Sequence, residues 1–570
     1  VLNLNAPIRS GGGNFTLTGS GISTVNVGNG GNSDNTGIIG QGVTLASTGG
    51  TVNLASGTFT DPATININKD LTLNGTSGTT VSGAGNKQVF NISGGTVNLN
   101  SLTITGGSTS GSGGGVFIGS TATVTISDST ISGNTATNGG GIYNSGSVSI
   151  SSSTLSGNSA TSNGGGIYNT GTLSISSSTL SGNSALSAGG GILNDLGSIS
   201  ISNSTLSGNS AGIGGGILNY LGSVGISNSS ISGNSVANSG GGIWNNGSVG
   251  ISNSTLSGNS ATSGGGMLNR GSVSLSNSTL SGNMAGYGGG IANFTGSVSM
   301  SGSSISGNSA TYGGGMINYQ GSVSISNSTL SSNLANSGGG ILNVGSLSLS
   351  SSSLSGNSAA SSGGGILNVG NLSLSSSSLS GNSAANSGGG IWNSGSVSMS
   401  SSTLSGNSAL SGGGMLNTGS VAISGSTLSG NSAGINGGGG IWNRGSLSIS
   451  NSSLSGNSAF NGGGILNYLG SVSITSSTLS GNTAANLGGG IWNSGSVDLT
   501  SSSLSGNIAQ ANGGGIYNRG SLTLSFSTIT LNTASIRGGG IFNFTGFTAV
   551  LTSSTVSGNT AGVQGNDIFP

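Results

Sequence analysis

The chain has 570 residues, of which only 2% are charged, and seven basic residues balance seven acidic ones. Ordinary soluble domains carry about 25% charged residues. The neutral balance therefore offers no electrostatic attraction for nucleic acid or for an anionic membrane surface. The sequence contains no His, Cys or Glu, which excludes catalysis by His or Cys and any disulfide. No apolar run approaches the roughly 20 residues that would span a bilayer.

Three regions follow one another along the chain. Residues 1–40 form an expected N-terminal β segment, which we interpret as an assembly or leading edge. Residues 41–115 contain alternating segments at 51–54, 71–73 and 96–99, and they predict irregular leading coils. Residues 116–570 repeat one unit regularly, which predicts a single repetitive body.

The regular unit is seen clearly at residues 139–163. The residue after each Gly-Gly-Gly is Ile, Met or Val, and it recurs every 24 to 26 residues from Val116 to Ile541. Within the unit, Val148-Ser149-Ile150 alternates as a half-buried strand, and Leu155 repeats the apolar signal after a serine-rich bend. No helical periodicity is present, so we expect no helix and no capping helix at either end.

These features predict an all-β protein, a right-handed parallel β-helix with three short strands per coil of about 25 residues and roughly 22 coils. A single coil is too small to bury its apolar face. Stacked coils bury a continuous core, and stability becomes a sum over neighbouring coils.

Two columns of asparagine accompany the repeat. The first follows the Gly-Gly-Gly-Ile segment and includes Asn144, Asn169 and Asn343, and the second ends the Leu-Ser-Gly-Asn segment and includes Asn158, Asn183 and Asn357. Asparagine tolerates the left-handed backbone of a sharp corner. Its amide can also donate to one neighbouring coil and accept from the other. We expect both roles here, and we expect structural ladders rather than ligand-binding amides.

Length variation is confined to two places in the unit. One lies between the second Asn and Gly-Gly-Gly. The other follows the first Asn, where extra residues occur at 194–197, 219–222, 293–296 and 467–470. Strands of fixed length joined by turns of variable length are typical of a solenoid.

The pair of motifs Gly-Gly-Gly-Ile (139–142) and Leu-Ser-Gly-Asn (155–158) resembles the tetrapeptide repeats of chlamydial polymorphic outer-membrane proteins. It also resembles the wider class of pectin-lyase-like right-handed β-helix proteins. The opening residues 2–8 and 11–15 are similar to repeats of filamentous-haemagglutinin-type bacterial exoproteins. Both resemblances imply a bacterial surface or secreted adhesin.

The residue directly after each Gly-Gly-Gly-Ile segment forms an apolar column. Its aromatic members are Tyr143, Tyr168, Trp244, Trp392, Trp442, Trp492, Tyr517 and Phe542. If the preceding Ile points inward, alternation turns this column outward as an exposed contact stripe. If the corner after Gly-Gly-Gly instead turns both residues inward, the column only widens the core. The sequence leaves both interpretations open.

The chain offers no catalytic, cofactor-binding or metal-binding residues. Glycoside cleavage needs two carboxylates facing one bond, whereas the Asp residues are separated by whole coils. A serine nucleophile needs a base, and only a Lys could serve. Calcium-binding solenoid repeats carry Asp in each turn, where this chain has Asn or Ser. We therefore expect no enzymatic activity and no cofactor.

The sequence predicts a secreted structural protein, the building block of an extracellular filament, sheath or adhesin stalk, located outside the cell or on a bacterial surface. Uncapped ends predict head-to-tail or lateral self-association. The alternative is a module that uses the aromatic stripe to bind a surface or carbohydrate. An ice-binding protein or a polysaccharide lyase is less well supported, because outward Thr-X-Thr ranks and clustered carboxylates are missing.

Overall fold

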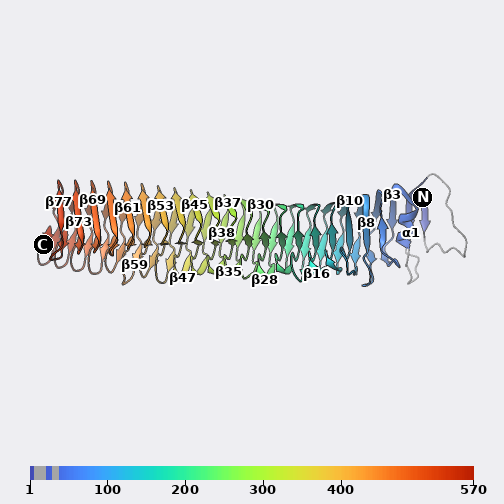
Figure 1. The fold of residues 1–570 in the computed structure, drawn as a ribbon, viewed down its shortest axis with the longest axis horizontal. Helices are drawn as coiled ribbons and strands as arrows, with labels where there is room; N and C mark the ends of the chain where they lie inside the picture. Colours follow the sequence, from blue (N-terminus) through green and yellow to red (C-terminus); the bar gives the residue numbers. More distant parts are fainter. Residues whose placement is uncertain (5–20, 29–37) are drawn as a thin grey trace. The chain divides into compact units, whose positions relative to one another are not determined.

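The computed structural model describes residues 1–4, 21–28 and 38–570. These residues form two compact units, Val1–Ser274 and Leu275–Pro570. Each unit is a stack of parallel β-coils (Figure 1). The haemagglutinin-like motifs at 5–8 and 11–15 lie outside the described residues, so that resemblance stays a prediction.

One coil of the first unit shows the construction. Strands β13 (Ile142–Asn144) and β14 (Ser147–Ser151) belong to one sheet, β15 (Thr154–Ser156) to a second and β16 (Ser159–Asn163) to a third. The coil pairs in parallel register with the next, Ile142 opposite Ile167 and Leu155 opposite Leu180. Along β14 the apolar residues point into the core and the serines point outward, as strand alternation requires.

The second unit repeats this coil. Strands β44 (Ile341–Asn343), β45 (Ser346–Ser350), β46 (Ser353–Ser355) and β47 (Ser358–Ser362) make the same circuit. Ile341 pairs with Ile366 and Leu354 with Leu379. The Ile column is completely buried, as Ile341 illustrates at 0% exposed.

The expected parallel β-helix is confirmed. In the described residues, nine strands of the β15 type lie in the first unit and twelve in the second, and β2 (Ile22–Val27) begins an earlier coil. This agrees with the roughly 22 coils predicted. The three expected strands are joined by the β16-type strand, which is only two residues long in many coils, for example β20 (Ser184–Ala185).

The leading coils use longer strands than the regular ones. Strands β3 (Ala46–Leu54), β8 (Phe90–Asn100) and β10 (Val116–Ser127) each run through the position where later coils break at Asn-X-Gly. Their partners in the coil are β1 (Leu2–Leu4), β4 (Gly57–Phe59), β5 (Ile65–Ile67), β6 (Leu71–Asn74), β7 (Thr79–Ser82) and β9 (Thr103–Thr105). The regular pattern therefore develops from these longer strands.

A helix at Ile38–Leu45, α1, corrects the expectation that the chain has none. It contacts β2, β3 and β5 and buries Ile39 and Val43, which lie one turn apart. The carboxylate of Asp61 accepts the N–H groups of Ile39 at 3.3 Å and Gly40 at 2.6 Å. An acceptor placed there satisfies helix N–H groups that have no partner within the helix. The expected boundary between residues 40 and 41 falls inside this helix.

The left-handed backbone positions also differ from the expectation. Neither asparagine column has a positive φ; the corners instead use Gly157 (φ 60°) and Ser152 (φ 48°), with Asn203 (φ 50°) at the position matching Ser152 in another coil. Asparagines such as Asn203 therefore do adopt left-handed backbone, but at a corner position outside the two ladder columns. The first-column asparagines end their strands, as Asn144 ends β13 and Asn343 ends β44.

Replacing Ile341 by Asp should unfold its own coil and loosen both neighbours, because an uncompensated buried charge costs on the order of 3–5 kcal/mol. Thermal melting and limited proteolysis measure the effect. Ser348→Asp is the control, since Ser348 is exposed on the adjacent strand and Asp498 occupies the matching outward position in another coil. Equal stability of the two variants would contradict an inward Ile column.

Candidate functional site

In β13 the half-buried Tyr143 lies between the buried Ile142 and Asn144, so strand alternation places the apolar column on the face opposite to the Ile column. In the second unit Ala292, Ile317 and Leu342 form a separate small cluster, packed against Phe294, Val344 and Leu367. Phe294 and Val344 belong to the turns that follow the first asparagine. The column therefore points away from the core and is partly covered by its own turns.

The structure corrects the expectation of a freely exposed stripe. Trp244, Tyr517 and Phe542 are buried at 9%, 7% and 8% exposed, and the other five aromatic residues of the predicted stripe are half-buried. The inward alternative predicts a column that only widens the core, whereas Ala292, Ile317 and Leu342 form a small cluster of their own. Strand alternation indicated the direction, but it carries no information on how far the turns cover the face.

Within each unit the column brings aromatic rings into stacks. Tyr143 stacks on Phe117 at 5.3 Å and on Tyr168 at 5.2 Å between ring centroids. A longer stack occurs in the second unit, at 5.1 to 6.5 Å between ring centroids. It comprises the column residues Trp442, Trp492, Tyr517, Phe542 and Phe569, with the turn residue Tyr468 stacked between Trp442 and Trp492. Such offset rings add stability beyond the area that they bury. Trp392 has no aromatic ring directly beside it in the column, since Leu367 and Leu416 are its neighbours in register.

The residues inserted in the turns carry the exposed apolar surface. Tyr220, Tyr319 and Tyr468 are 44% to 48% exposed, and Phe544 is 39% exposed. Two arginines each lie over an aromatic ring. The guanidinium carbon of Arg519 is 5.2 Å from the ring centroid of Phe544, and that of Arg270 is 5.9 Å from the ring centroid of Trp244. The surface available to a partner is therefore formed by turn residues beside the column.

The first asparagine column is a buried amide ladder in each unit. Asn144 Nδ2 donates to Asn169 Oδ1 at 2.7 Å and to the Thr172 carbonyl at 3.0 Å. Asn343 Nδ2 donates in the same way to Asn368 Oδ1 at 2.8 Å. Their side chains are 0% exposed. Burial without these partners would cost the full desolvation of each amide.

The second column forms a tighter ladder. Asn183 Oδ1 accepts both the backbone N–H of Asn158 at 3.0 Å and its Nδ2 at 2.9 Å. Asn183 Nδ2 donates onward to Asn209 Oδ1 and back to the Leu155 carbonyl. Asn357 makes the equivalent bonds to Asn333 and Asn382. Every donor and acceptor of the side chain is thus used.

A third ladder, made of serine, was missed by the sequence analysis. Ser153 Oγ accepts the N–H of Ser129 at 3.1 Å and donates to the Ser151 carbonyl at 2.7 Å. Ser352 repeats this geometry in the second unit. The signal was present as an invariant Ser before each Thr/Ser-Leu segment, but the surrounding serines conceal it.

Three carboxylates each bind a backbone group or a ladder residue. Asp61 holds α1, Asp70 accepts the N–H of Thr96 at 2.7 Å, and Asp567 accepts from Asn559 Nδ2 at 3.0 Å. Over the described ranges no group of three or more possible metal ligands occurs. The described residues also hold no helix that is long and apolar enough to cross a membrane.

Lys69, a Lys that could serve as the base of a serine nucleophile, instead forms hydrogen bonds to the backbone. Its Nζ donates to the carbonyl oxygens of Ala46 and Thr44. Burial lowers the pKa of Lys69. In the described part of the chain the hydrogen-bond acceptors of Lys69 are backbone carbonyl oxygens only.

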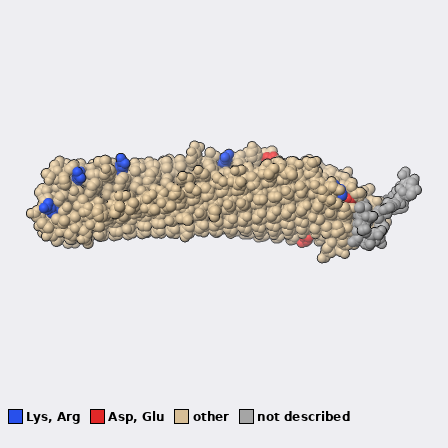
Figure 2. Space-filling model, turned by 90° about the horizontal axis from the view of Figure 1, so that it is seen from below, with Lys and Arg blue, Asp and Glu red and all other residues tan. Residues whose placement is uncertain are grey.

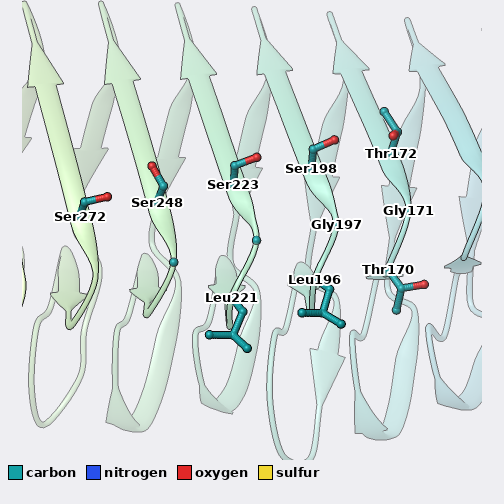
Figure 3. Close-up of a pocket in the computed structure, with 12 residues that line it drawn as sticks. Thr170, Gly171, Thr172, Leu196, Gly197, Ser198, Leu221, Ser223, Ser248 and Ser272 are labelled. Atoms are coloured by element: carbon teal, nitrogen blue, oxygen red, sulfur yellow. The ribbon is translucent and has the colours of Figure 1, made fainter.

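An open groove of about 690 Å³ runs along the first unit (Figure 3). Its floor is a column of glycines, including Gly171, Gly197 and Gly222, where a Cβ would overlap the carbonyl oxygen of the preceding coil. One side is formed by Leu196 and Leu221 from the inserted turns. The other is a row of hydroxyls at the strand starts, Thr172, Ser198, Ser223, Ser248 and Ser272.

The inserted turns beside the groove are held in place. Tyr168 Oη donates to Asp195 Oδ2 at 3.0 Å, and the N–H of Leu221 donates to the Asp195 carbonyl at 3.0 Å. Burial, followed by this hydrogen bond and the Asp195 charge, raises the pKa of Tyr168 to about 12. Tyr168 therefore stays neutral and anchors the first insertion.

Replacing Asn343 by Leu should destabilise the protein by about 1–3 kcal/mol, because Asn368 Oδ1 loses its buried donor while Asn318 Nδ2 keeps the Gly321 and Ser346 carbonyls. Chemical denaturation measures the change. The matched control is Asn371→Leu, at an exposed strand start. A neutral result for both would show that the ladder does not contribute to stability.

Replacing Ser352 by Ala should leave the N–H of Ser328 without an acceptor, at a similar cost of about 1–3 kcal/mol. Ser348→Ala removes an exposed hydroxyl from the preceding strand and should be nearly neutral. Amide hydrogen exchange at Ser328 gives a local readout. Unchanged protection there in the Ser352 variant would contradict a role for the serine ladder.

Comparison with known proteins confirms the repeat resemblance. The family model of the Chlamydia polymorphic membrane protein repeat matches residues 128–145, 152–170 and 501–519. The matched segments cover the corner after β14-type strands, the β15-type strand and the first asparagine. No curated protein sequence matches the chain significantly.

Two solved structures illustrate the structural likeness. The PL6 family alginate lyase AlyGC is 12% identical, with 94% of this chain and 99% of that chain covered and a TM-score of 0.24. PfbA, a surface adhesin of Streptococcus pneumoniae, is 12% identical, with 63% and 86% covered and a TM-score of 0.19. The chain is a β-solenoid repeat protein, and three of its segments match the Chlamydia polymorphic membrane protein repeat.

Proposed function

We propose that this chain is a non-enzymatic building block of an extracellular filament, sheath or adhesin stalk on a bacterial surface. The observation that carries the proposal is the triple ladder of buried Asn and Ser side chains in each unit, exemplified by Asn343, Asn357 and Ser352. These bonds run from coil to coil along the stack, together with the backbone bonds. The unit is built for cohesion along one direction.

The cohesion of the stack depends little on the composition of the surrounding solution. It uses no metal cluster among the described residues, no disulfide and very few charges. Neutral hydrogen bonds buried in the stack are weakly affected by salt and by pH near neutrality. These properties suit a protein exposed to a variable extracellular medium.

The absence of an enzymatic role is part of the same proposal. Asp61 at the helix and Asp70 at a backbone N–H are each engaged singly. Figure 2 shows one face on which charged residues are few. A glycoside-cleaving site would need two carboxylates at one point of such a face.

The partner we propose is a second copy of the chain, bound head-to-tail or side by side. Lateral contact would use the exposed turn aromatics Tyr319, Tyr468 and Phe544. Aromatic side chains bury a large area at small entropic cost. The low charge of the surface imposes little repulsion between copies.

Replacing Tyr319, Tyr468 and Phe544 together by Ser should abolish bundling and leave the coils folded, because these side chains lie outside the ladders. Negative-stain microscopy and sedimentation of the full chain measure assembly. The control replaces the exposed Leu186, Leu334 and Ile435 by Ser, which removes apolar surface elsewhere. The proposal would be overturned if the wild-type protein stays dispersed at every concentration. Equal bundling of the aromatic variant and the control variant would also overturn it.

A further inference from the structure

The groove of the first unit is shaped by two consecutive turn insertions. Residues 194–197 and 219–222 each carry one residue more than the usual Asn-X-Gly turn, so Leu196 and Leu221 rise beside the glycine floor. Backbone bonds from Tyr220 to Asn194 and from Leu221 to Asp195 stack the second insertion on the first. The wall is therefore ordered before any ligand arrives.

The opposite side of the groove presents unused hydrogen-bonding groups. Thr172, Ser198, Ser223 and Ser248 follow one another in register on adjacent strands, which places their hydroxyls about 4.8 Å apart. All four residues are exposed. In the described structure none of these hydroxyls has a protein partner, so each is free to donate and to accept.

The groove is also free of charge. None of the residues that line it is ionisable, and the neighbouring Asp195 carboxylate is held by Tyr168. Leu196 and Leu221, at 67% and 55% exposed, form an apolar wall that faces solvent. Convergent hydroxyls beside an apolar wall suit a ligand with both characters and no net charge.

We propose that this groove binds a neutral, linear oligosaccharide that runs along the stack of coils. An extended sugar chain presents hydroxyls at intervals comparable with the spacing of the coils, which matches the row of Ser and Thr. Its C–H faces would pack on Leu196 and Leu221. This ligand goes beyond the proposed structural function and does not depend on self-association.

The test uses calorimetric titration of the full chain with cellohexaose, mannohexaose and xylohexaose, and with the anionic hexagalacturonate for comparison. We expect at least one neutral hexasaccharide to bind and hexagalacturonate not to bind. The double variant L196A/L221A and the double variant S198A/S223A should each weaken that binding by about tenfold or more.

Matched controls separate the groove from the rest of the surface. Leu186→Ala with Leu334→Ala removes two exposed leucines elsewhere, and Ser149→Ala with Ser200→Ala removes two exposed outward hydroxyls that do not line the groove. Both controls should bind as the wild type does. Binding of hexagalacturonate alone, no binding of any neutral probe, or equal losses in groove and control variants would overturn the proposal. Bundling seen by microscopy is a separate readout, so failure here leaves the structural proposal standing.

Discussion

The structure depends on one constraint: a polar side chain buried in one coil must find its partner on the equivalent residue of the next. Inside the stack an asparagine has no water to bond, and an unpaired amide would be costly. Asn158 and Asn183 solve this by bonding in register, so the inward polar positions must keep their residue type from coil to coil. Outward positions carry no such condition, and the apolar column varies among Tyr, Leu, Trp and Ala. In the described residues the only buried side-chain nitrogen or oxygen atom without a hydrogen-bond partner is Asn512 Oδ1.

The same constraint decides where the chain can change length. In a short turn Asn169 Nδ2 donates to the Gly171 carbonyl, two residues on, and in a longer turn Asn194 Nδ2 donates to the Gly197 carbonyl, three residues on. The extra residue is expelled outward while the ladder and its glycine acceptor stay in place. Insertions are therefore tolerated without loss of a buried bond, and they become the parts of the coil that reach solvent.

Periodicity was enough to predict the coil, the inward Ile column and the two asparagine columns, because each depends on residue type at a fixed spacing. The serine ladder could not be recognised, since Ser149 and Ser151 point outward within the same run as the buried Ser153. Ser152, which has a left-handed backbone, also interrupts the alternation, so that Ser153 points inward where strict alternation from Ser149 and Ser151 would point it outward. Helix α1 depends on Asp61, 21 residues after Gly40, and a pattern of eight residues carries little signal of its own. The cover over the aromatic column was equally unpredictable, because it comes from turns whose path the strand pattern does not describe.

These turns also explain how one repeated coil can carry different surfaces. The second unit has its own pair of consecutive insertions, and there Phe294 and Tyr319 lie 6.2 Å apart as a tilted aromatic pair. The residues that follow them are Thr295 and Gln320, whereas the first unit has Leu196 and Leu221 at the corresponding positions. The same change in turn length thus yields an aromatic, polar edge in one unit and an apolar wall beside free hydroxyls in the other. Since the ladders fix the inward Asn and Ser residues, the identity of two or three turn residues is what can set the surface chemistry of a coil.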